Sequence, residues 1–257
     1  MNLLLINPNT SQSVSDLIEA EARRAAAPGT NVAVLTAAFG VAYIETRFES
    51  LIGAYATATL AAEHCDRHDA IVVAAFGDPG LDGLREVLDI PVVGLTEAAL
   101  MSACMLGKRF SIVAISHRIT AWYREVVTAN GLAGRLASIR NLDNPLKDIG
   151  RVQEDHTARL EALCLSAIQE DGADVIIIAG APLAGLARSI KDRIPVPVVD
   201  GVSSAVCHAQ TLVSLATLPA RQGSFAPPPH KPNHGLPDGI AALLGRDRTT
   251  RRASGVD

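Results

Sequence analysis

Short runs of β-branched and aliphatic residues recur along the chain, each followed by a turn of Gly, Pro, Asn or Ser and then by a longer helical pattern. This alternation is typical of βαβ units, whose parallel strands are apolar throughout because helices cover both faces of the sheet. We therefore predict an α/β protein. The predicted strands are 3–6, 32–35, 70–74, 92–93, 111–115, 175–178 and 198–199, with a further short strand near 136–139. The predicted helices are 14–25, 50–65, 81–88, 97–106, 120–128, 152–169 and 203–218.

Three strand-and-turn segments of the first half of the chain recur in the second half at a nearly constant offset, which indicates an old duplication. The pairs are 3–10 with 111–118, 72–81 with 176–186, and 91–98 with 197–204. We therefore predict two pseudo-symmetric flavodoxin-like lobes, each a parallel sheet of about four strands flanked by helices. The predicted first lobe comprises residues 1–97 and 208–245, the second comprises 98–207, and 246–257 form a frayed polar tail.

A duplicated α/β unit predicts where a ligand binds. Ligands in open parallel sheets lie beyond the carboxyl ends of the strands, so two such edges facing each other enclose one small-molecule site. Asn7, Asn9, Thr10 and Ser11 follow the first predicted strand and precede a helix. These residues could anchor an anionic or carbonyl group of a substrate, cap the helix, or do both.

Charge and composition exclude several classes of protein. The 23 Lys and Arg residues are dispersed among 27 Asp and Glu, and the net charge of −4 leaves no basic surface for nucleic acid. The amino terminus has no basic start, and no stretch approaches the ~20 apolar residues that span a bilayer, so we expect a cytoplasmic protein without membrane contact. Four widely spaced cysteines and the lack of a GxGxxG turn after a strand predict neither a metal site nor a cofactor.

Four segments resemble those of the aspartate/glutamate/hydantoin racemase superfamily, and within it the hydantoin and allantoin racemase branch. They are Ile-Asn-Pro-Asn-Thr-Ser at 6–11, Phe-Gly-Asp-Pro-Gly-Leu at 76–81, and the Pro-Val-Val segments that begin at Pro91 and Pro197. Their order and spacing agree with the family over roughly residues 2–215. The resemblance implies a cofactor-independent racemase that acts on a small molecule and assembles into a homo-oligomer.

The resemblance also implies a departure from the family's chemistry. Family members use two cysteines, one from each lobe, on opposite faces of the carbon that loses its proton. The matching positions in this chain are Ala75 and Ala181. Alanine has no lone pair and no dissociable proton, so it cannot act in general acid–base catalysis, and the two-thiol mechanism is excluded. The cysteines that remain all lie in helical patterns, where a structural thiol is the default. They are Cys65, Cys104, Cys164 and Cys207.

Four side chains are candidates to replace the thiols. Asp78 follows the first lost cysteine, but Asp-Pro-Gly is also a good helix start, and we favour Asp78 as the N-cap of the helix that follows. Glu97 is either a site residue or a first-turn acid that interacts with its helix dipole. His117 is either a proton-transfer group or part of an exposed polar turn. The fourth candidate, Tyr43, lies in the loop after the second strand.

That loop also contains Glu45 and Arg47, so its polar residues could close the cleft, bind a substrate, or be solvated. Of the three, we expect Tyr43 to point inward. The turns after the third strand of each lobe should present backbone N–H groups that can hold a carboxylate or an enolate-like oxygen. Further predicted substrate contacts in and beside the turns are Phe76, Gly77, Thr96, Ser116, Gly180 and Pro182.

Three functions therefore stay open at the level of the sequence. The first is an isomerase that acts on a hydantoin-type ring or an amino-acid-derived carboxylate with a non-thiol acid and base. The second is a lyase, decarboxylase or hydrolase that relies on the backbone N–H groups. The third is a small-molecule binding protein without catalysis.

Overall fold

Eight parallel strands form two separate sheets with the same strand order. The computed structural model describes residues 1–142, 149–216, 220 and 222–245. The first sheet has the order β2-β1-β3-β4 and the second the order β6-β5-β7-β8. The strands are β1 (Asn2–Asn7), β2 (Asn31–Thr36), β3 (Ala70–Val73), β4 (Val92–Gly94), β5 (Phe110–Ala114), β6 (Leu136–Asn141), β7 (Val175–Ile178) and β8 (Val198–Asp200). The predicted fold class is confirmed, and the shared order explains the internal repeat of the sequence. We call the part of the chain built on each sheet a lobe.

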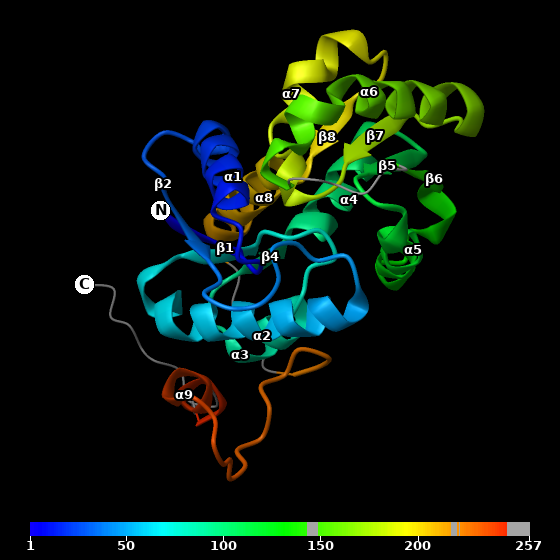
Figure 1. Cartoon of the computed structure of the whole chain (residues 1–257). Helices are drawn as coiled ribbons and strands as arrows, with labels where there is room; N and C mark the ends of the chain where they lie inside the picture. Colours follow the sequence, from blue (N-terminus) through cyan, green and yellow to red (C-terminus); the bar gives the residue numbers. More distant parts are fainter. Residues whose placement is uncertain (143–148, 217–219, 221, 246–257) are drawn as a thin grey trace.

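Helices cover both faces of each sheet (Figure 1). They are α1 (Gln12–Ala25), α2 (Arg47–His64), α3 (Leu81–Val87), α4 (Leu95–Leu106), α5 (Thr120–Ala129), α6 (Val152–Asp171), α7 (Leu186–Ile190), α8 (Gly201–Ser214) and α9 (Asp238–Gly245). Short 3-10 segments include His117–Ile119, Ala181–Leu183 and Lys191–Arg193. The last predicted helix ends at Ser214 rather than at residue 218, and residues 217 and 218 lie outside the described part of the chain.

The strand β1 shows why the inner positions of a strand in this fold are apolar on both faces. Side chains alternate between the two faces of a strand. Leu3 and Leu5 therefore belong to an apolar cluster that continues into the second lobe, whereas Leu4 and Ile6 belong to a second cluster of the first lobe. All four side chains are fully buried. Because both faces are covered, residues 3–6 are apolar, and the polar side chains of this strand lie at its two ends, Asn2 and Asn7.

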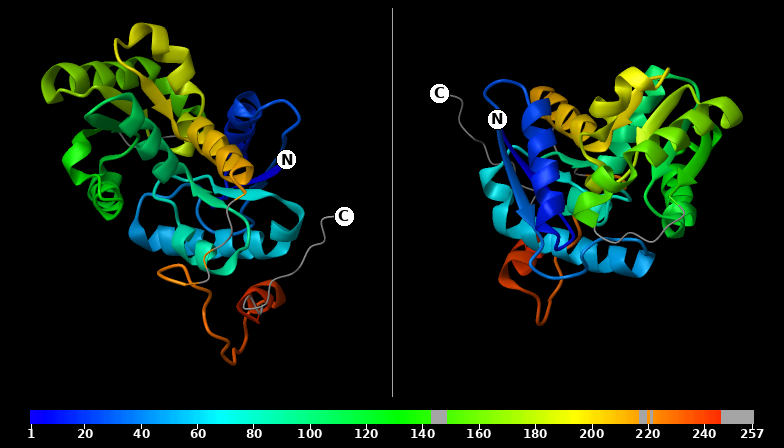
Figure 2. Two further views of the ribbon diagram at one scale, coloured as in Figure 1. Left: turned by 180° about the vertical axis from the view of Figure 1, so that it is seen from behind. Right: turned by 45° about the horizontal axis from the view of Figure 1, so that its top comes forward.

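Helices α4 and α8 join the two lobes. Helix α4 follows the first sheet but packs on β7 and β8, whereas α8 follows the second sheet and packs on β3 and β4. The two helices also pack on each other, and Ser102 and His208 form a hydrogen bond across this contact, with 3.2 Å between Oγ and Nε2. Figure 2 shows α8 lying between the lobes. This exchange of helices holds the carboxyl edges of the two sheets together.

The last part of the chain returns to the first lobe. An extended segment leads to α9, which packs against α2 (Figure 1). Within the described residues, no helix is long and apolar enough to cross a membrane, and no group of three or more His, Cys, Asp and Glu residues is placed to hold a metal ion.

Candidate functional site

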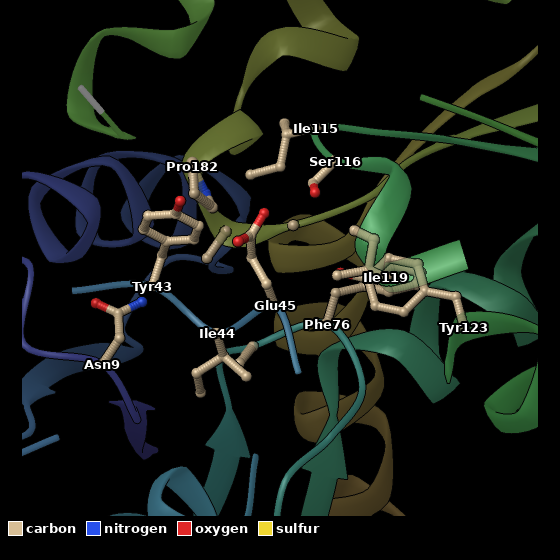
Figure 3. Close-up of a pocket in the computed structure, with 13 residues that line it drawn as sticks. Asn9, Tyr43, Ile44, Glu45, Phe76, Ile115, Ser116, Ile119, Tyr123 and Pro182 are labelled. Atoms are coloured by element: carbon tan, nitrogen blue, oxygen red, sulfur yellow. The ribbon is translucent and has the colours of Figure 1, made fainter. Parts of the chain in front are cut away.

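One cavity lies between the lobes, at the carboxyl ends of the strands (Figure 3). Its empty volume is about 450 Å³, including the part open to solvent. The first lobe contributes residues that follow β1, β2 and β3, and the second lobe contributes residues that follow β5 and β7. The lining residues are Asn9, Tyr43, Ile44, Glu45, Ala75, Phe76, Ile115, Ser116, Ile119, Tyr123, Gly180, Ala181 and Pro182.

Ala75 and Ala181, the two alanines that the family resemblance aligns with cysteines, line this cavity from opposite lobes. Ala75 follows β3 and Ala181 follows β7, the equivalent strand of the second sheet. Their side chains are nearly covered, with 8% and 3% exposed. Neither can move a proton, so any acid–base chemistry in the cavity depends on other lining residues.

The loop after β2 brings a carboxylate into the cavity. Figure 3 shows the carboxylate of Glu45 directed into the space near Tyr43, Ser116 and Pro182. Glu49 in the first turn of α2 holds this loop, because its Oε2 accepts hydrogen bonds from the backbone N–H groups of Glu45 at 2.8 Å and of Thr46 at 2.9 Å. Among the described residues that line the cavity, Glu45 is the only one with a carboxylate, and none is Lys or Arg.

Tyr43 lies beside this carboxylate, as expected for an inward-pointing residue. Burial raises the pKa of the Tyr43 hydroxyl, and the charge of Glu45 and a hydrogen bond to it raise the pKa further. The phenol therefore stays protonated and can donate its proton in a hydrogen bond. Arg47 does not enter the cavity; it pairs with Glu125 of α5 at 2.5 Å on the surface.

Of the four polar residues at the end of β1 and in the turn that follows, only Asn9 lines the cavity. Asn7 is fully buried, and its Nδ2 donates to Oδ1 of Asn9 at 3.1 Å and to Oγ of Ser15 at 2.9 Å. The side-chain oxygen of Asn9 also accepts a hydrogen bond from the N–H of Ser11 at 2.9 Å, so it is engaged within its own turn. Ser11 caps α1, and Thr10 is exposed, with its N–H bonded to the carbonyl of Val41 at 3.0 Å. Asn7, Thr10 and Ser11 thus support the turn from outside the cavity.

Contrary to the prediction from the sequence, Asp78 is not the N-cap of α3. Gly80 occupies that position, and the Asp78 carboxylate accepts hydrogen bonds from the N–H groups of Thr96 at 2.8 Å and Glu97 at 2.9 Å. It therefore caps α4 from a distance. The reason is the backbone: Asp78 has a positive φ of 50°, so the chain turns before Gly80 and the side chain faces the start of α4. Burial raises the pKa of Asp78 to about 7.

The neighbours of Asp78 also serve the turn rather than the cavity. The N–H of Gly77 donates to Oγ1 of the buried Thr96 at 2.5 Å. Glu97 forms a bidentate ion pair with Arg85. Gly77, Asp78, Thr96 and Glu97 all lie outside the lining set, so the structure groups them as a support for the turn that carries Ala75.

In the second lobe, the consecutive residues Ser116 and His117 lie in different surroundings. Ser116 is buried and lines the cavity, while His117 is exposed and borders a shallow surface groove along α5. A further lining residue, Tyr123, is buried in α5, and its ring packs on Phe76 with 4.6 Å between centroids. Burial raises the pKa of its hydroxyl. No sequence signal distinguishes it from an ordinary core aromatic residue on a helix.

Gln153 of α6 was also missed, although it holds the turn that carries Ala181. Its Nε2 donates to the carbonyls of Pro182 and Ala184, both at 2.9 Å. Gly180 begins this turn with a φ of 107°, a conformation that favours glycine. The cavity is not lined by any cysteine of the chain, and burial raises the pKa of Cys164 to about 12.

Two parallel sheets with a cavity between their carboxyl edges define a two-lobed α/β protein with a small-molecule site between the lobes. Residues 3–209 match the family model described as Asp/Glu/hydantoin racemase, so the chain is a member of this family, as the motifs predicted. It is 36% identical to a hydantoin racemase of Paenarthrobacter aurescens over 90% of this chain and 99% of that protein. It is 32% identical to a hydantoin racemase of Pseudomonas sp. (strain NS671) over 98% of this chain and 100% of that protein.

Solved structures agree with this assignment. Allantoin racemase from Klebsiella pneumoniae superposes with a TM-score of 0.89 at 32% identity, and covers 96% of this chain and 100% of its own. Allantoin racemase from Pseudomonas fluorescens gives a TM-score of 0.85 at 36% identity, over 91% of this chain and 100% of its own. Arylmalonate decarboxylase, at 16% identity and a TM-score of 0.60, shares the fold.

Proposed function

We propose that the chain is a racemase that binds a neutral hydantoin-type ring between Ala75 and Ala181 and moves a proton at the ring's stereogenic carbon without thiols. The observation that carries the proposal is the Glu45 carboxylate inside the shared cavity, in a member of the hydantoin racemase family. The relatives named hydantoin racemase and allantoin racemase support the substrate class.

The charge of the lining favours a neutral ring over an acidic substrate. Glu45 contributes the one carboxylate among the described lining residues, and no Lys or Arg among them pairs with it. An amino-acid carboxylate or an arylmalonate would meet repulsion there. A hydantoin ring is neutral and carries N–H groups, which can donate hydrogen bonds to a carboxylate. A decarboxylase acting on dianions is therefore the less favoured alternative.

The same residues can carry the proton transfer. Glu45 would take the proton from the ring carbon, which breaks the C–H bond, forms the carboxylic O–H and leaves an enolate whose charge lies on the ring oxygen. Among the described residues, none accepts a hydrogen bond from the N–H groups of Phe76 or Ala181, so these donors are available to that oxygen. The hydroxyl of Ser116 or Tyr123 in the opposite wall would give its proton to the other face of the ring carbon, and the proton held by Glu45 would then pass through solvent to that oxygen, which restores both groups.

The alanines at positions 75 and 181, which cannot move a proton, favour a second candidate, a protein that binds the ring without turnover. Deuterium exchange at the stereogenic carbon of 5-benzylhydantoin and allantoin, followed by proton NMR at pH 7 against an enzyme-free blank, separates the two. We expect exchange with the natural chain and a loss of about 10²–10⁴-fold in the Glu45→Gln variant. Tyr43→Phe, which keeps the carboxylate, should lose less.

A variant with both thiols restored, Ala75→Cys together with Ala181→Cys, is the positive control for ring binding. Exchange in this variant but not in the natural chain would support the binding protein and overturn the thiol-free racemase. Equal exchange rates in the natural chain and Glu45→Gln would exclude Glu45 as the base. Unchanged melting temperatures show that the variants are folded.

A further inference from the structure

A second hollow lies where α1 of the first lobe meets α4, α7, β8 and α8. Its empty volume is about 740 Å³, including the part open to solvent. It shares no lining residue with the cavity of Ala75 and Ala181. Helix α1 forms one wall, and the segment Leu186–Arg193, which contains α7, forms another. The hollow is therefore a separate junction between the lobes.

Two buried carboxylates border this hollow, and both are already satisfied. Asp200 accepts hydrogen bonds from the N–H groups of Ser203 at 2.9 Å and Gly185 at 2.7 Å. Glu21, with 3% exposed, accepts three hydrogen bonds from Arg24 and one from the hydroxyl of Ser203. Neither carboxylate is available to a ligand, so the hollow is not a cation site.

Three cationic side chains surround these carboxylates, which leaves a surplus of positive charge on a chain whose net charge is −4. Arg24 is committed to Glu21. Arg188 reaches Glu21 only at 3.5 Å and keeps 55% of its side chain exposed. Lys191 makes no ion pair with any residue of the described ranges. Nη2 of Arg188 donates to Glu21, but among the described residues its Nε and Nη1 and the ammonium group of Lys191 have no such partner and can bind an anion.

We propose that this hollow binds a small anion with a carboxylate or phosphate group. Arg188 would contact two of its oxygens in parallel, and Lys191 would add a point charge. The hydroxyl of Ser204 lines the same hollow and can donate a further hydrogen bond. An anion held there would lie beside α1 of the first lobe, because Arg24 of that helix lines the same hollow.

Titration of the full chain with inorganic phosphate and, separately, with succinate tests the site. Calorimetry and melting temperature are measured at constant ionic strength set with chloride. We expect saturable binding and a rise in melting temperature, since a ligand that binds only the folded state stabilises it. The variant Arg188→Ala/Lys191→Ala should bind at least about tenfold more weakly. The tighter of the two anions identifies the preferred group.

The matched control is Arg193→Ala/Lys231→Ala, which also removes two charges. Arg193 pairs with Glu161 outside the hollow, and Lys231 is exposed in the extended segment before α9. This control should keep the affinity of the natural chain within about twofold. Absence of saturable binding, an equal loss in both double variants, or displacement of the anion by 5-benzylhydantoin would overturn the proposal. The last result would place the anion in the cavity of Glu45 instead.

Discussion

Asp78 shows how burial changes the acid–base behaviour of one carboxyl group. Its oxygens accept hydrogen bonds from two N–H groups at the start of α4, which favours the charged form. The loss of hydration is the larger effect, and it raises the pKa from 3.8 to about 7. This carboxyl group therefore titrates near neutral pH although it lies outside the cavity, beside the turn that carries Ala75.

The raised pKa predicts a specific dependence of stability on pH. Between about pH 4 and pH 7 the folded chain binds more protons at Asp78 than the unfolded chain, so the free energy of unfolding falls as pH rises through this range. Above pH 7 the contribution is constant. Relative to Asp78→Asn, which does not titrate, the natural chain should lose on the order of a few kcal/mol between pH 4 and pH 8. Urea unfolding of both proteins at several pH values measures the difference. If the free energy of unfolding had the same pH dependence in both proteins, a pKa near 7 for Asp78 would be contradicted.

At the scale of elements, the turn between β3 and α3 depends on close packing against α5. Gly77 has a φ of 102°, and a Cβ atom at this position would lie 2.3 Å from a ring carbon of Trp122. The turn and the helix come from different lobes, so this contact aligns Ala75 and Phe76 with the second wall of the cavity.

Gly77→Ala should therefore destabilise the chain by roughly 2–4 kcal/mol, because backbone strain and overpacking act together. Gly83→Ala in the adjacent α3 is the matched control. Its Cβ would meet nothing within 4 Å, so it should stabilise by roughly 0.5–1 kcal/mol through helix propensity. Urea unfolding measures both. Equal effects of the two substitutions would show that Trp122 does not constrain the turn.

At the scale of the whole molecule, the crossing of α4 and α8 sets the relation between the lobes. A Cβ atom at Gly201 would lie 2.3 Å from Cδ2 of Leu95, which is almost fully buried. The Arg47–Glu125 ion pair also joins the lobes, but both side chains are more than half exposed and such pairs contribute little. The apolar crossing is the main connection.

Gly201→Ala should cost roughly 1–3 kcal/mol of stability, because Leu95 must move in a packed interface. In the double variant with Leu95→Ala, the total loss should be smaller than the sum of the two single losses, since removal of the leucine side chain makes room for the new methyl group. Gly134→Ala, whose Cβ would meet nothing within 4 Å, is the neutral control. If the stability losses of the two single variants simply add in the double variant, a steric conflict between Leu95 and the new methyl group would be contradicted.

Much of the architecture was predictable because it depends on local patterns. The fully apolar strands, the helical spacing between them and the internal repeat indicated two parallel sheets of equal order, and the structure contains them. Individual site residues were harder to predict from the sequence. Asn9, Tyr43 and Ser116 line the cavity, whereas Asn7, Thr10 and His117 do not, because neighbours along one turn point in different directions.

The sequence by itself determined the family and the two sheets, since these depend on residue identity and order. Only the tertiary structure decided which polar groups meet. The Glu45 carboxylate enters the cavity because Glu49 of α2 binds its loop, and Asp78 leaves it because a positive φ turns its side chain toward α4. Such outcomes depend on backbone dihedrals and contacts between distant elements, which no local pattern of residues encodes.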